Sequence, residues 1–322
     1  MPAAQPTDTL AYALSPLQHG MLFHALSARE RGVDIEQLEG KLHEKINTDL
    51  FAQAWGEVAA RHDVLRTAFR WEGLEAPRQE VVPAVSTPIE VFDLSAAPAD
   101  EQEVRIRTFL SEDRHRGFDL RVAPLWRVTL FRLGETEYRM VWTYSHAILD
   151  SCYADVLREV FAVYESATRG EKAAPVERRP YREHIAWLEE MLRARADEAK
   201  TFWRGQLAGF VTPTNLDAVQ AARMQSAPAG APSGHDTVRF KLSRETRDAI
   251  VSFCTANDLR VSVFVEAAWA LVLSAFSGEN DVVFGSTRAC RRSSIPGADA
   301  IIGLFINTVP VRARIAEDQP LA

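Results

Sequence analysis

Residues 144–151 read YSHAILDS and place His146 four positions before Asp150. An imidazole has a pKa of about 6.5, which lets a histidine accept or release a proton close to neutral pH. The preceding apolar run YRMVWTY predicts a buried strand, and the spacing of apolar residues over 152–168 predicts a helix. His146 is therefore expected where a strand gives way to a helix, a position that α/β proteins commonly use for chemistry.

The same pattern also has a purely structural explanation. A polar residue can close a strand, and Asp150 and Ser151 are both good N-cap residues for the helix that follows. The spacing His-x-x-x-Asp alone leaves an acid-base role and a structural role open.

The other histidines form no group suited to a metal ion. His19 and His24 lie five positions apart with no carboxylate or cysteine nearby, and His62 and His184 are expected to be polar residues at helix ends. No metal site is predicted. Gly-x-Ser-x-Gly, Walker and Gly-x-Gly-x-x-Gly sequences are absent, so the signatures of hydrolases, NTPases and dinucleotide-binding proteins are missing.

Composition limits the class of protein and its partners. The 322 residues are 47% hydrophobic and 25% charged, which is enough apolar material for two lobes. The 37 Lys and Arg residues against 44 Asp and Glu residues give a formal charge of -7, which argues against a nucleic-acid partner. No stretch reaches the roughly 18 consecutive apolar residues of a membrane span, and the N-terminus does not resemble a secretion signal. Cys152, Cys254 and Cys290 are widely spaced and form no Cys-x-x-Cys pair, which fits a reducing cytoplasm.

The pattern of the first half predicts an α/β lobe over residues 14–175, preceded by a flexible lead over residues 1–13. Apolar periodicity and cap residues give the following elements: strands at 34–42, 64–71 and 78–83, a hairpin at 126–133 and 137–146, and helices that begin at Ser15, at 47–49, at 100 and at 152. The Pro- and charge-rich stretch GEKAAPVERRPY then predicts a linker between lobes.

A second lobe of the same character is expected over residues 176–322. Its predicted elements are two helices within 182–210, a mobile low-complexity segment at 225–234, a strand at 237–242, helices at 243–257 and 261–276, and strands at 281–288 and 301–315. Because the chain stops soon after a strand, this lobe is expected to be incomplete.

Five motifs together resemble a known family. They are LSPLQHGMLFH, RHDVLRTAF, the stretch from Ser145 to Ser151, YREHIAW and GLFINTVPVR, in the order and approximate spacing of condensation domains of nonribosomal peptide synthetases. The resemblance covers residues 14–314. It implies an α/β (α+β sandwich) fold of two lobes, each similar to chloramphenicol acetyltransferase, arranged in a V with a tunnel between them.

The resemblance also implies a reaction. Donor and acceptor arrive as thioesters on the phosphopantetheine of peptidyl carrier proteins, next to an adenylation domain, and the domain itself binds no cofactor. The acceptor amine attacks the donor carbonyl and forms an amide. His146 matches the family's catalytic histidine, Asp150 the motif aspartate that pairs with an arginine, for which Arg288 is the candidate, and Asn307 a residue near the tunnel.

The sequence departs from the family pattern His-His-x-x-x-Asp-Gly at two positions. Ser145 replaces the first histidine, which mostly supports local structure in the family, and Ser151 replaces the glycine. The Cβ of Ser151 is expected to narrow the space beside His146 and to restrict φ. Family members also continue for over a hundred residues past the GLFINT motif, so the chain is expected to be C-terminally truncated.

Two other functions compete with amide formation. A degenerate, non-catalytic module that docks carrier proteins or a tailoring enzyme would explain the two serines and the missing end. A free-standing acyltransferase that uses CoA thioesters would share the His-x-x-x-Asp motif. An epimerisation or a heterocyclisation domain is disfavoured, because the chain lacks the Glu-Gly-His-Gly-Arg-Glu stretch of the former and keeps His146 in place of the paired aspartates of the latter.

Overall fold

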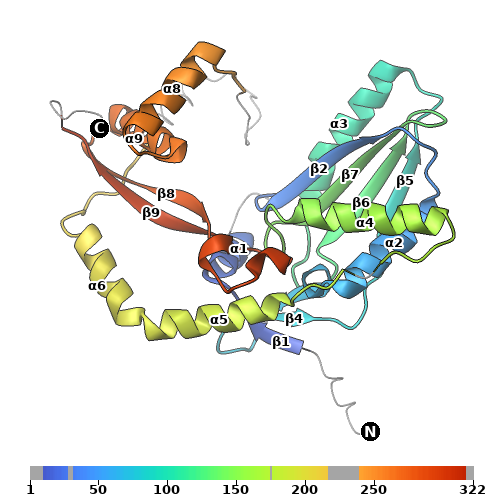
Figure 1. Ribbon diagram of the computed structural model, residues 1–322, viewed down its shortest axis with the longest axis horizontal. Helices are drawn as coiled ribbons and strands as arrows, with labels where there is room; N and C mark the ends of the chain where they lie inside the picture. The colour runs from blue at the N-terminus through green and yellow to red at the C-terminus, as the bar shows by residue number, and fades with distance from the viewer. Residues whose placement is uncertain (1–9, 28–31, 175, 217–238, 317–322) are drawn as a thin grey trace, which may run out of the picture. The chain divides into compact units, whose positions relative to one another are not determined.

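The computed structural model describes residues 10–27, 32–174, 176–216 and 239–316. The chain forms two compact units (Figure 1). Unit 1 comprises Met1–Ala194 and Ala289–Asn307, and unit 2 comprises Arg195–Arg288 and Thr308–Ala322. Unit 1 includes helix α5 (Tyr181–Ala194) and the segment Ala289–Asn307, which were expected in the lobe 176–322. The division into lobes 14–175 and 176–322 stays a prediction. The predicted low-complexity segment 225–234 lies outside the described residues.

A four-stranded sheet forms the centre of unit 1. Its order is β2 (Ile35–Leu42), β7 (Tyr138–Ser145), β6 (Trp126–Arg132) and β5 (Ile89–Asp93). The predicted hairpin is confirmed, since β6 and β7 are antiparallel neighbours. Strand β2 pairs antiparallel with the other edge of β7, and the register sets Ile35 opposite Ser145.

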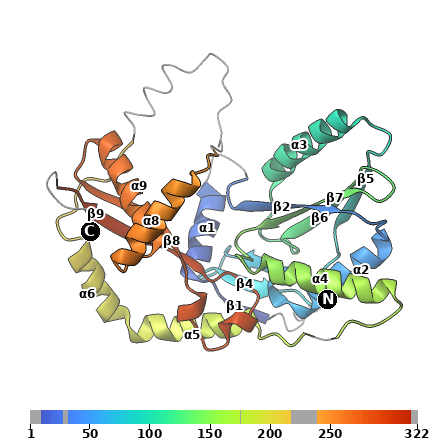
Figure 2. The ribbon, with the colours of Figure 1, turned by 45° about the horizontal axis from the view of Figure 1, so that its top comes forward.

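Helices cover both faces of this sheet, as expected for strands that are apolar on both sides (Figures 1 and 2). On one face α2 (Thr48–Arg61) and α4 (Tyr153–Thr168) pack together. There Trp55 of α2 stacks on Trp126 at 5.1 Å and meets Trp142 edge-on at 4.9 Å. On the other face α3 (Ala99–Arg116) contributes Ile106 to a cluster with Phe131 and Val141. Successive residues of a strand point to opposite faces, which explains how Val141 and Trp142 serve different layers.

A smaller antiparallel sheet completes the first half of unit 1. Its order is β1 (Leu10–Ala13), β4 (Arg78–Val81) and β3 (Thr67–Arg70). Residues 10–13, expected in the flexible lead, instead pair with β4. The predicted strand 64–71 is shorter than expected, because η1 (Asp63–Arg66) takes up its first residues. Helix α1 (Pro16–Ser27) begins where predicted, with the Ser15 hydroxyl accepting a hydrogen bond from the Gln18 N–H at 3.2 Å.

The segment Ala289–Asn307 returns to unit 1 beside α5 (Tyr181–Ala194). It contains the short helices η2 (Arg291–Ser293) and η3 (Ala298–Ala300). A parallel bridge joins Arg179 to Ile301 just before α5 begins. The strand predicted over 301–315 is therefore shorter, and β9 spans Ile306–Arg314.

Unit 2 contains α6 (Ala196–Gln206), α8 (Arg244–Ala256), α9 (Val261–Ser277) and most of the paired strands β8 (Asp281–Ala289) and β9. The Ser243 hydroxyl caps α8 as predicted, accepting from the Thr246 N–H at 3.1 Å. The strand predicted over 237–242 is wrong for its described part, since residues 239–242 have no regular structure. Phe240 is 80% exposed there, so neither a second strand nor a core among the described residues buries the apolar side of this alternating pattern.

No single helix of the described ranges is both long and apolar enough to cross a bilayer. Helices α8 and α9 reach that length and composition only as a pair, bent by 107° at the break between them.

Candidate active site

His146 lies at the end of β7, in the turn that leads into α4. Residues 140–150 are all buried except His146, which is partly exposed. The predicted strand-to-helix junction is thus confirmed, and the chain presents one imidazole from an otherwise enclosed stretch. A substrate can contact the ring only if the residue is at least partly exposed, and His146 meets this condition.

Local hydrogen bonds fix the orientation of the His146 ring. Its backbone N–H donates to the Asp34 carbonyl at 2.8 Å, which extends the pairing of β7 with β2 by one residue. Its Nδ1 lies 2.7 Å from the Leu149 carbonyl oxygen. Because a carbonyl oxygen can only accept, Nδ1 must carry the proton, and in the neutral ring Nε2 holds the lone pair. The turn thereby selects the tautomer in which Nε2 can act as a base.

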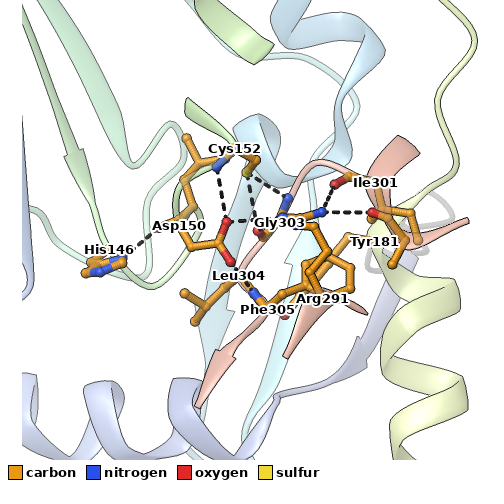
Figure 3. A network of polar contacts seen from close by, with 11 residues as sticks. His146, Asp150, Cys152, Tyr181, Arg291, Ile301, Gly303, Leu304 and Phe305 are labelled. Carbon is orange, nitrogen blue, oxygen red and sulfur yellow. Dashed lines mark hydrogen bonds and ion pairs between the residues drawn. The ribbon is translucent and has the colours of Figure 1, made fainter. Parts of the chain in front are cut away.

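Asp150 is directed away from that ring and into a separate polar network (Figure 3). Its side chain is 5% exposed. Oδ2 accepts from the Phe305 N–H at 2.7 Å, and Oδ1 accepts from the Cys152 N–H at 3.2 Å. Oδ1 also forms an ion pair with Arg291 at 3.1 Å. Asp150 therefore joins the β7–α4 turn to the segment that returns from β8, which is a structural task.

The arginine predicted to pair with Asp150 was the wrong one. Arg288 forms an ion pair with Glu266 of α9 at 3.0 Å, and the partner of Asp150 is Arg291. The Arg291 guanidinium also donates to the carbonyls of Ala298 and Ile301 and lies 4.0 Å from the centre of the Phe305 ring. These contacts need the fold of η2 and η3, which the run RACRR in the sequence does not reveal.

Two further residues that hold this network, Tyr181 and Cys152, were assigned no role from the sequence, although Tyr181 opens the YREHIAW motif. The Tyr181 hydroxyl donates to the Leu304 carbonyl at 2.7 Å, and its ring packs against Gly303 (Figure 3). A Cβ on Gly303 would lie 2.2 Å from that ring. The Cys152 thiol donates to the Gly303 carbonyl at 3.3 Å. Burial, with a smaller contribution from Asp150, raises the pKa of Cys152 to about 11, so this cysteine remains a thiol at neutral pH.

The two serines that depart from the family motif lie in different environments. Ser145 is 2% exposed and ends β7. Ser151 is exposed, and Asp258 is the sole non-glycine residue with positive φ in the described part of the chain. Ser151 therefore adopts a backbone conformation open to any L residue, so the expected restriction of φ causes no strain at this position. The expected narrowing of the space beside His146 stays a prediction.

A pocket of about 440 Å³ adjoins the His146 turn. The turn contributes Ser145 and Ala147 to its wall, α1 contributes Met21, and the residues before β2 contribute Asp34. This volume lies in the range of small-molecule binding sites. The pocket thus offers room for a substrate group next to this turn, although His146 itself is not among the described residues that line it.

Asn307 lines a second, smaller pocket of about 190 Å³, together with His184, Phe305 and Cys290. His184 is buried, stacks on Phe305 at 4.1 Å and shares a 2.7 Å hydrogen bond with the Ser294 hydroxyl. Burial, followed by the nearby Arg291, lowers the pKa of His184 to about 4. The role of Asn307 near a tunnel stays a prediction.

The remaining histidines within the described ranges show no metal-binding arrangement. His62 follows α2 and lies 2.9 Å from the buried Glu159 carboxylate, which also pairs with Arg178. Within the ranges that the structure describes, no three His, Cys, Asp or Glu side chains come together as a metal site would require.

Comparison with known proteins identifies the family and the fold. The family model described as "Condensation domain" matches residues 9–322. One of the linear gramicidin synthase proteins of Brevibacillus parabrevis is 38% identical over 309 residues, which is 96% of this chain and 4% of that protein. Bacitracin synthase 3 of Bacillus licheniformis is 31% identical over 308 residues, which is 95% of this chain and 5% of that protein.

Solved structures agree. The first condensation domain of the calcium-dependent antibiotic synthetase aligns with a TM-score of 0.74 at 18% identity, covering 96% of this chain and 71% of that chain. The SgcC5 protein from Streptomyces globisporus aligns with the same TM-score at 25% identity, covering 95% of this chain and 69% of that chain.

The chain belongs to the condensation-domain family, which confirms the resemblance and the mixed α/β fold that it implied. It spans 4% and 5% of the length of the two synthases named above.

Proposed function

We propose that this chain is a nonribosomal peptide synthetase condensation domain that forms an amide bond between two carrier-bound substrates. The observation that carries this proposal is the geometry of His146, the partly exposed residue in an otherwise buried stretch, with Nδ1 held by the Leu149 carbonyl. The relatives support it because two of them are named as a linear gramicidin synthase and a bacitracin synthase. Phosphopantetheine enters as the arm of each substrate and not as a resident cofactor.

The proposed step is the aminolysis of a thioester. The acceptor amine forms a bond to the donor carbonyl carbon, and the bond between that carbon and sulfur breaks. The nitrogen loses one proton, and the departing sulfur gains one to become the free thiol of the donor carrier. The lone pair on Nε2 of His146 can receive the proton from nitrogen and pass it to sulfur, or hold the amine in line for attack.

Much of the acceleration is expected to come from tethering. Two substrates delivered into one site react at a high effective concentration, and thioester aminolysis is already favourable. The protein then has to position the amine and accept a proton, which one imidazole can do. Asp150 takes no part in this step and instead supports the turn from behind through Phe305 and Arg291.

The partners that this function requires are a donor and an acceptor peptidyl carrier protein, with an adenylation domain to load a carrier. The cytoplasmic location expected from the sequence stays a prediction.

The test requires this protein and two loaded carriers. A donor carrier bearing a labelled acyl group and an acceptor carrier bearing an aminoacyl group are mixed, and intact mass spectrometry follows the label. Transfer of the label to the acceptor carrier is expected. In a second reaction, labelled acyl-CoA and a soluble amine replace the two carriers. Acylation of the amine here, with no transfer between the carriers, would indicate the CoA-dependent alternative. Binding of both carriers without any transfer would indicate the docking alternative.

A further inference from the structure

One carboxylate beside His146 has no role in the step above. Asp34 precedes β2, and its carbonyl accepts the His146 N–H at 2.8 Å. Its side chain lines the 440 Å³ pocket together with Ser145 and Ala147. Among the described residues, no hydrogen bond or ion pair engages its carboxylate, although the side chain is partly buried. Burying an ionised carboxylate without a counterion costs free energy. Binding of a cation would therefore stabilise the ionised form of Asp34.

The other charged side chains that line this pocket are already neutralised. Arg116 forms ion pairs with Asp113 at 2.6 Å and with Glu90 at 3.7 Å, and Asp113 also pairs with Arg127 at 2.6 Å. These two arginines therefore face two carboxylates. Asp119 pairs with Arg121 at 2.9 Å. Asp34 is therefore the uncompensated charge of the described pocket wall. The pocket carries a net negative charge when Asp34 is ionised, and it favours a positive group.

The surroundings of Asp34 agree with this assignment. Burial raises the pKa of Asp34, and the imidazoles of His24 and His146 oppose that rise. A bound ammonium would act in the same direction as these imidazoles. It would stabilise the ionised carboxylate and gain a charge-assisted hydrogen bond.

In the proposed reaction, the acceptor substrate carries an ammonium group that must come close to His146. A free α-amine has a pKa of about 8 and is mostly protonated at neutral pH. The acceptor must present that amine beside His146, and a basic side chain of the acceptor would carry a second ammonium. The acyl carbonyl of the donor brings no obligatory positive charge.

We infer that Asp34 is a specificity-determining residue that binds a primary ammonium of the acceptor substrate in the pocket beside His146. The ammonium is either the α-amine of the acceptor or the amine at the end of its side chain. This inference rests on the proposed function for the identity of the ligand, but the recognition itself requires only the pocket and its carboxylate.

Binding rather than turnover tests the inference. Three pantetheine amides serve as probes: lysyl, with two ammonium groups; norleucyl, with the α-ammonium alone; and hexanoyl, with none. Calorimetry compares the wild-type protein with Asp34→Asn, which keeps the side-chain volume and removes the charge. Asp100→Asn is the matched control, since Asp100 is an exposed carboxylate in the first turn of α3.

The expected result is about a tenfold loss of affinity in Asp34→Asn, which corresponds to about 1.4 kcal/mol. A loss for lysyl and norleucyl probes alike assigns the α-ammonium, and a loss for the lysyl probe alone assigns the side-chain amine. The hexanoyl probe should bind both proteins equally. Asp34→Glu keeps the charge and should retain most of the affinity.

Equal affinity of wild type and Asp34→Asn for every probe, or no binding of any probe, would overturn the inference. Transfer between loaded carriers by the same wild-type preparation reports separately on the proposed function. A protein that transfers the acyl group but shows no dependence on Asp34 would disprove this inference alone. A protein that binds ammonium probes through Asp34 without transfer would disprove the proposed function alone.

Discussion

Asp150 and Arg291 lie 141 positions apart in the sequence and form an ion pair of 3.1 Å in which both side chains are largely buried. The pair fastens the turn that carries His146 to the segment between β8 and β9. His146 itself faces away from this pair (Figure 3). The motif His-x-x-x-Asp thus separates into an exposed imidazole for chemistry and a buried carboxylate for support.

This pairing predicts strong energetic coupling between Asp150 and Arg291. In a double-mutant cycle with Asp150→Asn and Arg291→Met, the coupling energy for unfolding in urea should be about 2 kcal/mol, because each single change leaves a buried group without its partner. The control is a second double-mutant cycle of Asp150→Asn with Arg288→Met, because Arg288 pairs with Glu266. Coupling of Asp150 to Arg288 that equals or exceeds its coupling to Arg291 would refute the assignment.

Gly303 is predicted to tolerate no side chain. Its Cβ would lie 2.2 Å from the Tyr181 ring, and the ring is held by the hydrogen bond to Leu304. Gly303→Ala should lower the free energy of unfolding by about 3 kcal/mol.

The control for this change is Gly20→Ala in α1, where an added Cβ meets nothing within 4 Å. Alanine is the better helix residue, so stability there should be unchanged or slightly higher. Chemical denaturation of both variants makes the comparison. Equal stability of Gly303→Ala and wild type would contradict the close packing against Tyr181.

The low pKa of the buried His184 predicts that the protein loses stability as the pH falls. Its pKa is about 4 in the folded protein, whereas a histidine of the unfolded chain titrates at about 6.5. Between these values the unfolded chain binds more protons, so the free energy of unfolding falls as the pH decreases through this window. The slope from this group is at most about 1.4 kcal/mol per pH unit.

His184→Asn removes the titrating group and can keep a hydrogen bond to Ser294. The difference in unfolding free energy between the two proteins should change by about 2 kcal/mol from pH 6.5 to pH 4, while contributions of carboxylates cancel. Parallel pH profiles for the two proteins would show that His184 is not held in its neutral form by burial.

Ser151 is predicted to be neutral for catalysis. It is exposed and adopts an ordinary φ, so the glycine of the family motif has no conformational advantage here. Ser151→Gly should change the rate of transfer between loaded carriers by less than about twofold. A tenfold gain in rate would instead indicate that the serine side chain obstructs the acceptor.

Local signals in the sequence predicted much of the fold. Asn47 caps α2, Ser243 caps α8, and the apolar runs on either side of Gly134 form the β6–β7 hairpin. Each of these features depends on residues close together in the chain. They were predictable because capping and strand pairing across a short turn follow local rules.

Features that depend on distant segments were harder to predict. The apolar pattern predicted that His146 lies at the end of a strand, but the choice between Arg288 and Arg291 depends on how the residues after β8 fold back on unit 1. The packing of Gly303 against Tyr181 has the same origin. Asp34 lies outside the five family motifs. Its proposed role follows from the pairing of β2 with β7, which brings its backbone into contact with His146.

The most direct test of the account is the single-turnover rate of acyl transfer to the acceptor carrier in His146→Ala. The matched control is His115→Ala, because the His115 ring also has Nδ1 at 2.7 Å from a backbone carbonyl, that of Ser111, but is exposed on α3. A positioned general base contributes at least about 100-fold, so His146→Ala should lose that factor while His115→Ala keeps the wild-type rate. A His146→Ala protein that folds normally and transfers at the wild-type rate would contradict the central claim.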